Sequence, residues 1–209
     1  MDIPKILGDP AAVKARLAKL DEPHVAPLTA FVRKLRVERG RPDCVPYFDP
    51  ADGGVEAEFL FVLLSPGSKA IGSGFISRNN PDETAKNIFT LTREAGIDRK
   101  RCVNWNVVPW YIGSSLKTGK PSALDRQKGL EALSQLIKLL PRLKTVVLMG
   151  NDAHRAEWAL RHEFPDLQVV KTMHPSPLAV NNRPENRDLL REQLKAAMNK
   201  CESFEGETI

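Results

Sequence analysis

Cysteine is scarce in this chain, and its three cysteines are far apart. Cys44, Cys102 and Cys201 are odd in number, and no C-x-x-C pair occurs. This spacing argues against a disulfide framework and against a zinc or iron–sulfur site built from cysteines. We therefore expect the protein to bind no metal and no cofactor.

Long apolar runs and the common hydrolase motifs are also missing. No apolar run approaches the roughly 20 residues of a membrane helix, and the N-terminus has no apolar core of the signal-peptide type. The sequence contains no G-x-S-x-G, no P-loop and no spaced set of metal ligands. We expect a cytoplasmic protein without membrane contact, and a small-molecule α/β hydrolase is disfavoured.

Basic residues exceed acidic ones, 31 against 26, and the formal net charge is +5. This excess is compatible with binding a polyanion but does not demonstrate it. The length of 209 residues suggests a single domain over 1–209. Within it we expect residues 1–57 to form N-terminal helices and a loop, and residues 201–209 to form a flexible tail.

Short apolar segments rich in β-branched or aromatic residues predict buried strands at 59–64, 102–108, 145–149 and 167–172. Amphipathic patterns predict helices around them, at 10–20, 25–39, 81–96, 122–141, 151–164 and 184–198. Alternation of strands and helices is typical of a parallel sheet covered on both faces. The predicted fold is a three-layer α/β/α sandwich with a central, mainly parallel four-stranded sheet.

Small and polar residues follow the predicted strands. "SPGSKAIGSGF" begins at Ser65, Asn104 and Asn106 lie in the second strand, "GND" begins at Gly150, and "MHPSPLA" begins at Met173. Ligands of open parallel sheets bind beyond the carboxyl ends of the strands. We therefore expect these segments to form a binding or catalytic site.

Each candidate residue also has a structural interpretation. Phe75 is either a core residue or a ring on which a flat ligand stacks. The amide of Asn106 needs partners inside an apolar strand, and these are either backbone groups or the edge of a nucleobase. His174 is either a structural hydrogen-bonding residue or part of a site. In "HPSPLA" two prolines stiffen a loop whose free N–H groups and hydroxyl suit a phosphate.

Together, "LLSPG", "GF", "AKNIFTLTREAGIDRKRCVNWNVV" and "HPSPLA" resemble the uracil-DNA glycosylase superfamily in their order and spacing. "HPSPLA" is similar to the second motif of the superfamily almost letter for letter, whereas "LLSPG" resembles the first motif loosely. The resemblance implies that Phe75 stacks on an extruded uracil, that Asn106 reads its edge beside Gly67, and that His174 stabilises charge on O2 of the leaving base.

The same resemblance implies a DNA-binding loop. Pro66, Pro175, Ser176 and Pro177 would contact the DNA backbone, and Leu178 would enter the duplex in place of the extruded base. The thermostable branch of the superfamily binds an iron–sulfur cluster through four cysteines, and this chain has only three.

The residue that positions the attacking water departs from the superfamily pattern. The first motif usually offers Asp, Asn or Glu, and here Ser65 (or Leu64, one residue earlier) takes that place. A serine hydroxyl cannot serve as a general base near pH 7. Asn79, Asn80 and Asp82 are the other candidates, and the carboxylate of Asp82 is equally suited to the N-terminus of a helix.

These features predict a monofunctional DNA repair glycosylase. It would flip uracil, or another deaminated base, out of DNA and hydrolyse the N-glycosidic bond, releasing free uracil and leaving an abasic site. We expect a monomer that acts in the bacterial nucleoid. The alternative is a non-catalytic DNA- or nucleobase-binding protein on the same scaffold, which Ser65 in the first motif favours.

Overall fold

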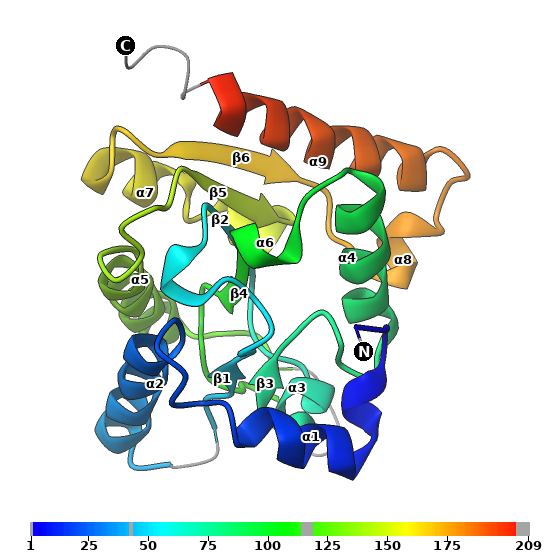
Figure 1. Ribbon diagram of the computed structural model, residues 1–209. Helices are drawn as coiled ribbons and strands as arrows, with labels where there is room; N and C mark the ends of the chain where they lie inside the picture. The colour runs from blue at the N-terminus through cyan, green and yellow to red at the C-terminus, as the bar shows by residue number, and fades with distance from the viewer. Residues whose placement is uncertain (1, 42–43, 114–118, 204–209) are drawn as a thin grey trace.

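The computed structural model describes residues 2–41, 44–113 and 119–203 (Figure 1). At its centre lies a four-stranded sheet in the order β4-β2-β5-β6, and each neighbouring pair is parallel. The strands are β2 (Phe59–Leu63), β4 (Cys102–Asn106), β5 (Thr145–Met149) and β6 (Gln168–Thr172). The four predicted strands are confirmed.

The helices surround this sheet, mostly at the predicted places. Their bounds are α1 (Pro10–Leu17), α2 (Ala26–Arg39), α3 (Ser68–Ser73), α4 (Glu83–Glu94), α5 (Ala123–Ile137), α6 (Asn151–His154), α7 (Glu157–Glu163), α8 (Pro177–Val180) and α9 (Asn186–Ser203). The single helix predicted over 151–164 is wrong, because the chain forms α6 and α7 there. Nε2 of His154 donates to the carbonyl of Thr172 at 2.8 Å and so ties the end of α6 to β6.

The two faces of the sheet carry separate hydrophobic clusters, because side chains alternate along a strand. On β2, Leu60 and Val62 pack in a cluster with residues of α2, α5 and α7. Phe59 and Phe61 point the other way and pack with residues of α4 and α9. Figure 1 shows α2 and α5 on one side of the sheet and α4 and α9 on another. The predicted three-layer sandwich is confirmed.

Several short elements escaped prediction. They are the helices α3 and α8, the strands β1 (Tyr47–Phe48) and β3 (Phe75–Ile76), and the 3₁₀ turns η1 (Ile6–Gly8), η2 (Gly54–Glu56) and η3 (Arg99–Arg101). β1 and β3 pair in parallel as a small separate sheet. β1 and η2 fall within residues 1–57, where the sequence predicted only helices and a loop.

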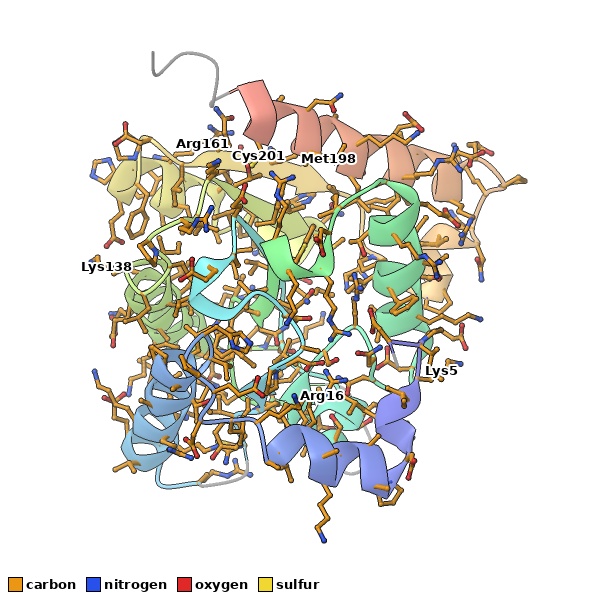
Figure 2. All side chains as sticks on the ribbon, viewed as in Figure 1. Lys5, Arg16, Lys138, Arg161, Met198 and Cys201 are labelled. Carbon is orange, nitrogen blue, oxygen red and sulfur yellow. The ribbon has the colours of Figure 1, made fainter. Side chains whose placement is uncertain are left out.

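The C-terminal helix is longer than expected. α9 continues to Ser203, and Cys201 (labelled in Figure 2) is fully buried in the cluster beneath α9. The flexible tail predicted for 201–209 is therefore wrong at 201–203, and 204–209 lie outside the described residues. Among the residues that the structure describes, no helix is long and apolar enough to cross a membrane.

Candidate active site

A cavity of about 470 Å³ lies at the carboxyl ends of β2 and β4. Its wall consists of the turn after β2, the chain around the start of α4, the inner face of β4 and the loop after β6. Seven predicted site residues line it, namely Ser65, Pro66, Gly67, Asn80, Asp82, Asn106 and His174. The fold thus brings together candidates that are more than one hundred positions apart in the sequence.

His174 reaches this cavity from the loop after β6. The backbone N–H of Ser176 donates a hydrogen bond to Nδ1 of His174 at 3.0 Å. A ring nitrogen that accepts a hydrogen bond carries no proton, so the neutral ring holds its proton on Nε2. Burial lowers the pKa of His174 below its ordinary value, and the charge of Asp152 opposes this shift. At pH 7 His174 is therefore a neutral imidazole with an Nε2–H to donate.

Gly150 packs against the ring of His174. A Cβ at position 150 would lie 2.8 Å from Cδ2 of His174 and 2.9 Å from its Cβ, which is closer than real Cβ contacts. The φ of Gly150 is +91°, a backbone conformation that other residues rarely adopt. The sequence placed "GND" at this edge of the sheet but gave Gly150 no role. In the structure, Gly150 lets the imidazole of His174 approach the backbone closely.

The loop that carries His174 is held from two helices. Nδ2 of Asn87, on α4, donates to the carbonyl of Pro175 at 2.9 Å. The N–H of Met173 donates to Oε1 of Gln193, on α9, at 3.0 Å. Neither contact is readable from the sequence, because the two helices meet the loop only in the folded chain. Together they fix the direction of the imidazole.

The second half of the same loop begins the short helix α8. Oγ of Ser176 accepts a hydrogen bond from the N–H of Ala179 at 3.3 Å, and Pro177 is the first residue of α8. Both are favoured at a helix start. Leu178 follows on the outside, and its side chain is 86% exposed. A large apolar side chain on such a firm support suits insertion into a partner.

Two asparagines of β4 face the cavity. Asn106, at the end of the strand, and Asn104, two residues earlier, both line it, and both are buried. The Oδ1 atoms of both are buried and have no hydrogen-bond partner among the described residues. The structural interpretation of Asn106 required backbone groups to satisfy its amide. The Oδ1 of Asn106 has no such backbone partner.

The candidates for holding water differ in their free hydrogen-bonding capacity. The amide of Asn80 is used, because its Oδ1 accepts from Oγ of Ser73 at 2.6 Å and its Nδ2 donates to the carbonyl of Phe75 at 2.9 Å. Asn79 is buried away from the cavity, where its Nδ2 donates to the carbonyl of Ile3 at 2.7 Å. Ser65 and Asp82 are left.

Asp82 is the N-cap of α4, and one of its two oxygens is used there. Its Oδ1 accepts from the N–H of Ala85 at 2.9 Å. Among the described residues that line the cavity, Asp82 alone carries a carboxylate. The interpretation of Asp82 as a helix-cap residue is therefore confirmed. The cap does not use the second carboxylate oxygen, so Asp82 stays a candidate for holding water.

The structure does not bring Phe75 to the cavity. Its side chain is fully buried in a cluster with Leu7 and Leu20, and the neighbouring Ile76 lines the cavity instead. Because successive side chains of a strand point to opposite faces, the pairing of β3 with β1 sends these two residues in opposite directions. For Phe75 we therefore retain the core interpretation and not the stacking role.

Comparison with known proteins agrees with this arrangement. The family model of the uracil DNA glycosylase superfamily matches residues 50–197, so the chain belongs to this superfamily. A solved structure described as the crystal structure of wild-type SMUG2 from Pedobacter heparinus is similar, with a TM-score of 0.54. The two share 13% sequence identity over 83% of this chain and 84% of that one, which shows a common fold. No curated protein matches the chain.

Proposed function

We propose that this protein is a monofunctional uracil-DNA glycosylase that hydrolyses the bond between uracil and deoxyribose. Membership of the superfamily supports a function of this type. The observation that carries the proposal is the neutral His174, which lines the same cavity as Asn106. Within one cavity, the Nε2–H of His174 can stabilise the leaving base, and the amide of Asn106 can hold the base in place.

In the proposed reaction the N-glycosidic bond breaks as the base takes up the bonding electrons. Negative charge develops on O2 of the uracil, while the sugar gains oxocarbenium character. His174 donates its Nε2–H toward that oxygen, and the imidazole stays neutral throughout. A preorganised donor at a developing oxyanion contributes about 3–4 kcal/mol in comparable sites.

The remaining residues hold the substrate. Asn106 reads the edge of the base through its amide, and the turn at Gly67, which has open space beside its Cα, lets the base approach the backbone. Pro175, Ser176 and Pro177 contact the DNA backbone together with Pro66. Leu178 takes the place of the extruded base in the duplex.

Asp82 is our candidate for the acceptor of the water proton. The water attacks C1′ of the sugar, and its proton passes to the second oxygen of Asp82, with Ser65 as a further hydrogen-bond partner of the water. The uracil anion then takes up a proton from solvent and Asp82 releases the one that it accepted, so the products are free uracil and DNA with an abasic site.

A second candidate function is a DNA- or nucleobase-binding protein without catalysis. It is favoured by Ser65 in the first motif and by the fully used amide of Asn80. Incubation with an oligonucleotide that contains one uracil, followed by alkali, separates the two functions. Cleavage at the uracil supports the glycosylase, whereas a gel shift without cleavage supports the binding protein.

A further inference from the structure

Asn104 lines the same cavity as Asn106 and has no role in the function proposed above. The two asparagines are two residues apart on β4, so their side chains leave the same face of the strand, about 6–7 Å apart along it. In the register with β2, Asn104 is opposite Phe61 and Asn106 is opposite Leu63. Asn104 is 4% exposed, so only a ligand within the cavity can reach its amide.

The orientation of the Asn104 amide is fixed by a buried ion pair behind it. Nδ2 of Asn104 donates to Oδ2 of Asp52 at 3.1 Å. Oδ1 of the same carboxylate accepts from Nε of Arg99 at 2.7 Å, and Arg99 also donates to Asp49 at 2.7 Å. Burial raises the pKa of Asp52, and the charge of Arg99 opposes this shift. With Arg99 donating to it at 2.7 Å, the carboxylate acts as an acceptor, so the NH₂ of Asn104 faces Asp52.

The oxygen of Asn104 is consequently left without a donor. Its Oδ1 is buried and has no partner within the described part of the chain. A buried carbonyl oxygen without a partner destabilises the folded protein. A bound molecule that donates a hydrogen bond to this oxygen would supply the missing partner.

We propose that Asn104 is a second base-reading residue, whose Oδ1 accepts a hydrogen bond from an N–H of the extruded base. The inference rests on the proposed function and adds a specificity determinant to it. Uracil carries a proton on N3, whereas cytosine has a bare acceptor at the same position. The fixed Oδ1 of Asn104 attracts the N3–H of uracil and repels the bare N3 of cytosine. Asn104 therefore helps to reject the cytosines of normal DNA.

Asp52 acts as a positioning residue in this arrangement. An asparagine with free rotation can present either its oxygen or its NH₂ group, and it would accommodate uracil and cytosine alike. The contact with Asp52 removes the second orientation. The buried pair of Asp52 and Arg99 thereby serves the selection of the base without touching it.

The test compares the binding of two single-stranded oligonucleotides, which differ in one base and need no unpairing. One contains uracil and the other cytosine, each on a 2′-fluorinated arabinose that resists hydrolysis of the glycosidic bond. We expect the Asn104→Ala variant to lower the ratio of uracil to cytosine affinity by roughly tenfold, the value of one neutral hydrogen bond. The Thr29→Val variant is the matched control, because Thr29 makes a buried hydrogen bond to Leu20 at 2.7 Å away from the cavity. It should lower stability and leave the ratio unchanged.

Two further measurements cover a variant that fails to fold. Asn104→Leu fills the space that alanine leaves and should lower the same ratio. In the wild-type protein, the side-chain carbonyl ¹³C resonance of Asn104 should shift with the uracil oligonucleotide and not with the cytosine one. An unchanged ratio in a folded variant, or an equal shift with both oligonucleotides, would overturn the role of Asn104. Cleavage of ordinary deoxyuridine by the wild-type protein tests the proposed function separately, so the two failures are distinguishable.

Discussion

The backbone N–H of Ser176 donates to Nδ1 of His174, two residues earlier in the same loop, at 3.0 Å. The segment that we propose to contact DNA phosphate therefore also sets the tautomer of the residue that we propose to act on the base. Because the donor is a backbone group, the tautomer depends on the shape of the loop and not on the serine side chain. The prolines at 175 and 177 stiffen that shape.

The first prediction concerns pH. The pKa of His174 is lowered in the folded protein, so the unfolded chain takes up a proton near pH 6.5, its ordinary value, before the folded chain does. The free energy of unfolding should therefore fall as the pH falls below about 6.5. Denaturant unfolding at pH 7.5 and 5.5 measures this fall. The fall in the free energy of unfolding should be smaller in His174→Gln than in wild type. It should have the wild-type size in His162→Gln, which alters an exposed histidine on α7. Equal falls in wild type and His174→Gln would contradict the assignment.

The second prediction concerns Gly150. Gly150→Ala places a Cβ against the imidazole and forces an unfavourable φ, so we expect it to lower stability by about 1–3 kcal/mol and to reduce excision further by displacing His174. Gly72→Ala is the control, because a Cβ there meets nothing within 4 Å. Thermal unfolding and excision rates measure both effects. If Gly150→Ala behaves like Gly72→Ala, the close packing on His174 is not required.

The third prediction separates the two candidates for holding water. Asp82→Asn keeps an acceptor for the cap of α4 and removes the base, so excision should fall by roughly 10²–10⁴-fold with little loss of stability. Ser65→Ala should cost less, because a hydroxyl only orients the water. Single-turnover rates decide the order. A larger loss in Ser65→Ala would assign the water to the first motif.

The fourth prediction concerns the exposed Leu178. Leu178→Ala should slow excision most for uracil paired with adenine, less for uracil opposite guanine, and least in single strands, since unstacking a paired base costs a few kcal/mol. Leu124→Ala removes another exposed leucine, 58% exposed on α5, and should have no effect. Equal losses on all three substrates would make Leu178 a general contact and not a wedge.

The sequence predicted the centre of the sheet well, because residues 59–63 and 145–149 form strands that are buried along nearly their whole length and read as continuous apolar runs. The position of the cavity followed from the predicted parallel sheet, because small and polar residues gather at the carboxyl ends of its strands. Asn106 and His174 were found in this way, and both line the cavity.

Side-chain direction and partner choice were beyond the sequence. Phe75 and Ile76 are neighbours, and only the pairing of β3 with β1 decides which of them meets the cavity. Asn80 was a sound candidate until Ser73 and the carbonyl of Phe75 were seen to use its amide. The orientation of Asn104 depends on Asp52, more than fifty positions earlier. Such contacts leave no local pattern in a single sequence.

The central claim is that a neutral His174 stabilises the leaving base. Its most direct test is the single-turnover rate of uracil excision by wild type and His174→Ala at saturating enzyme, with DNA affinity measured in parallel. We expect the wild type to excise uracil and His174→Ala to be slower by roughly 10²–10³-fold, as for the loss of one oxyanion donor, with nearly unchanged affinity. Equal rates in the two proteins, or DNA binding by the wild type without any excision, would contradict the account.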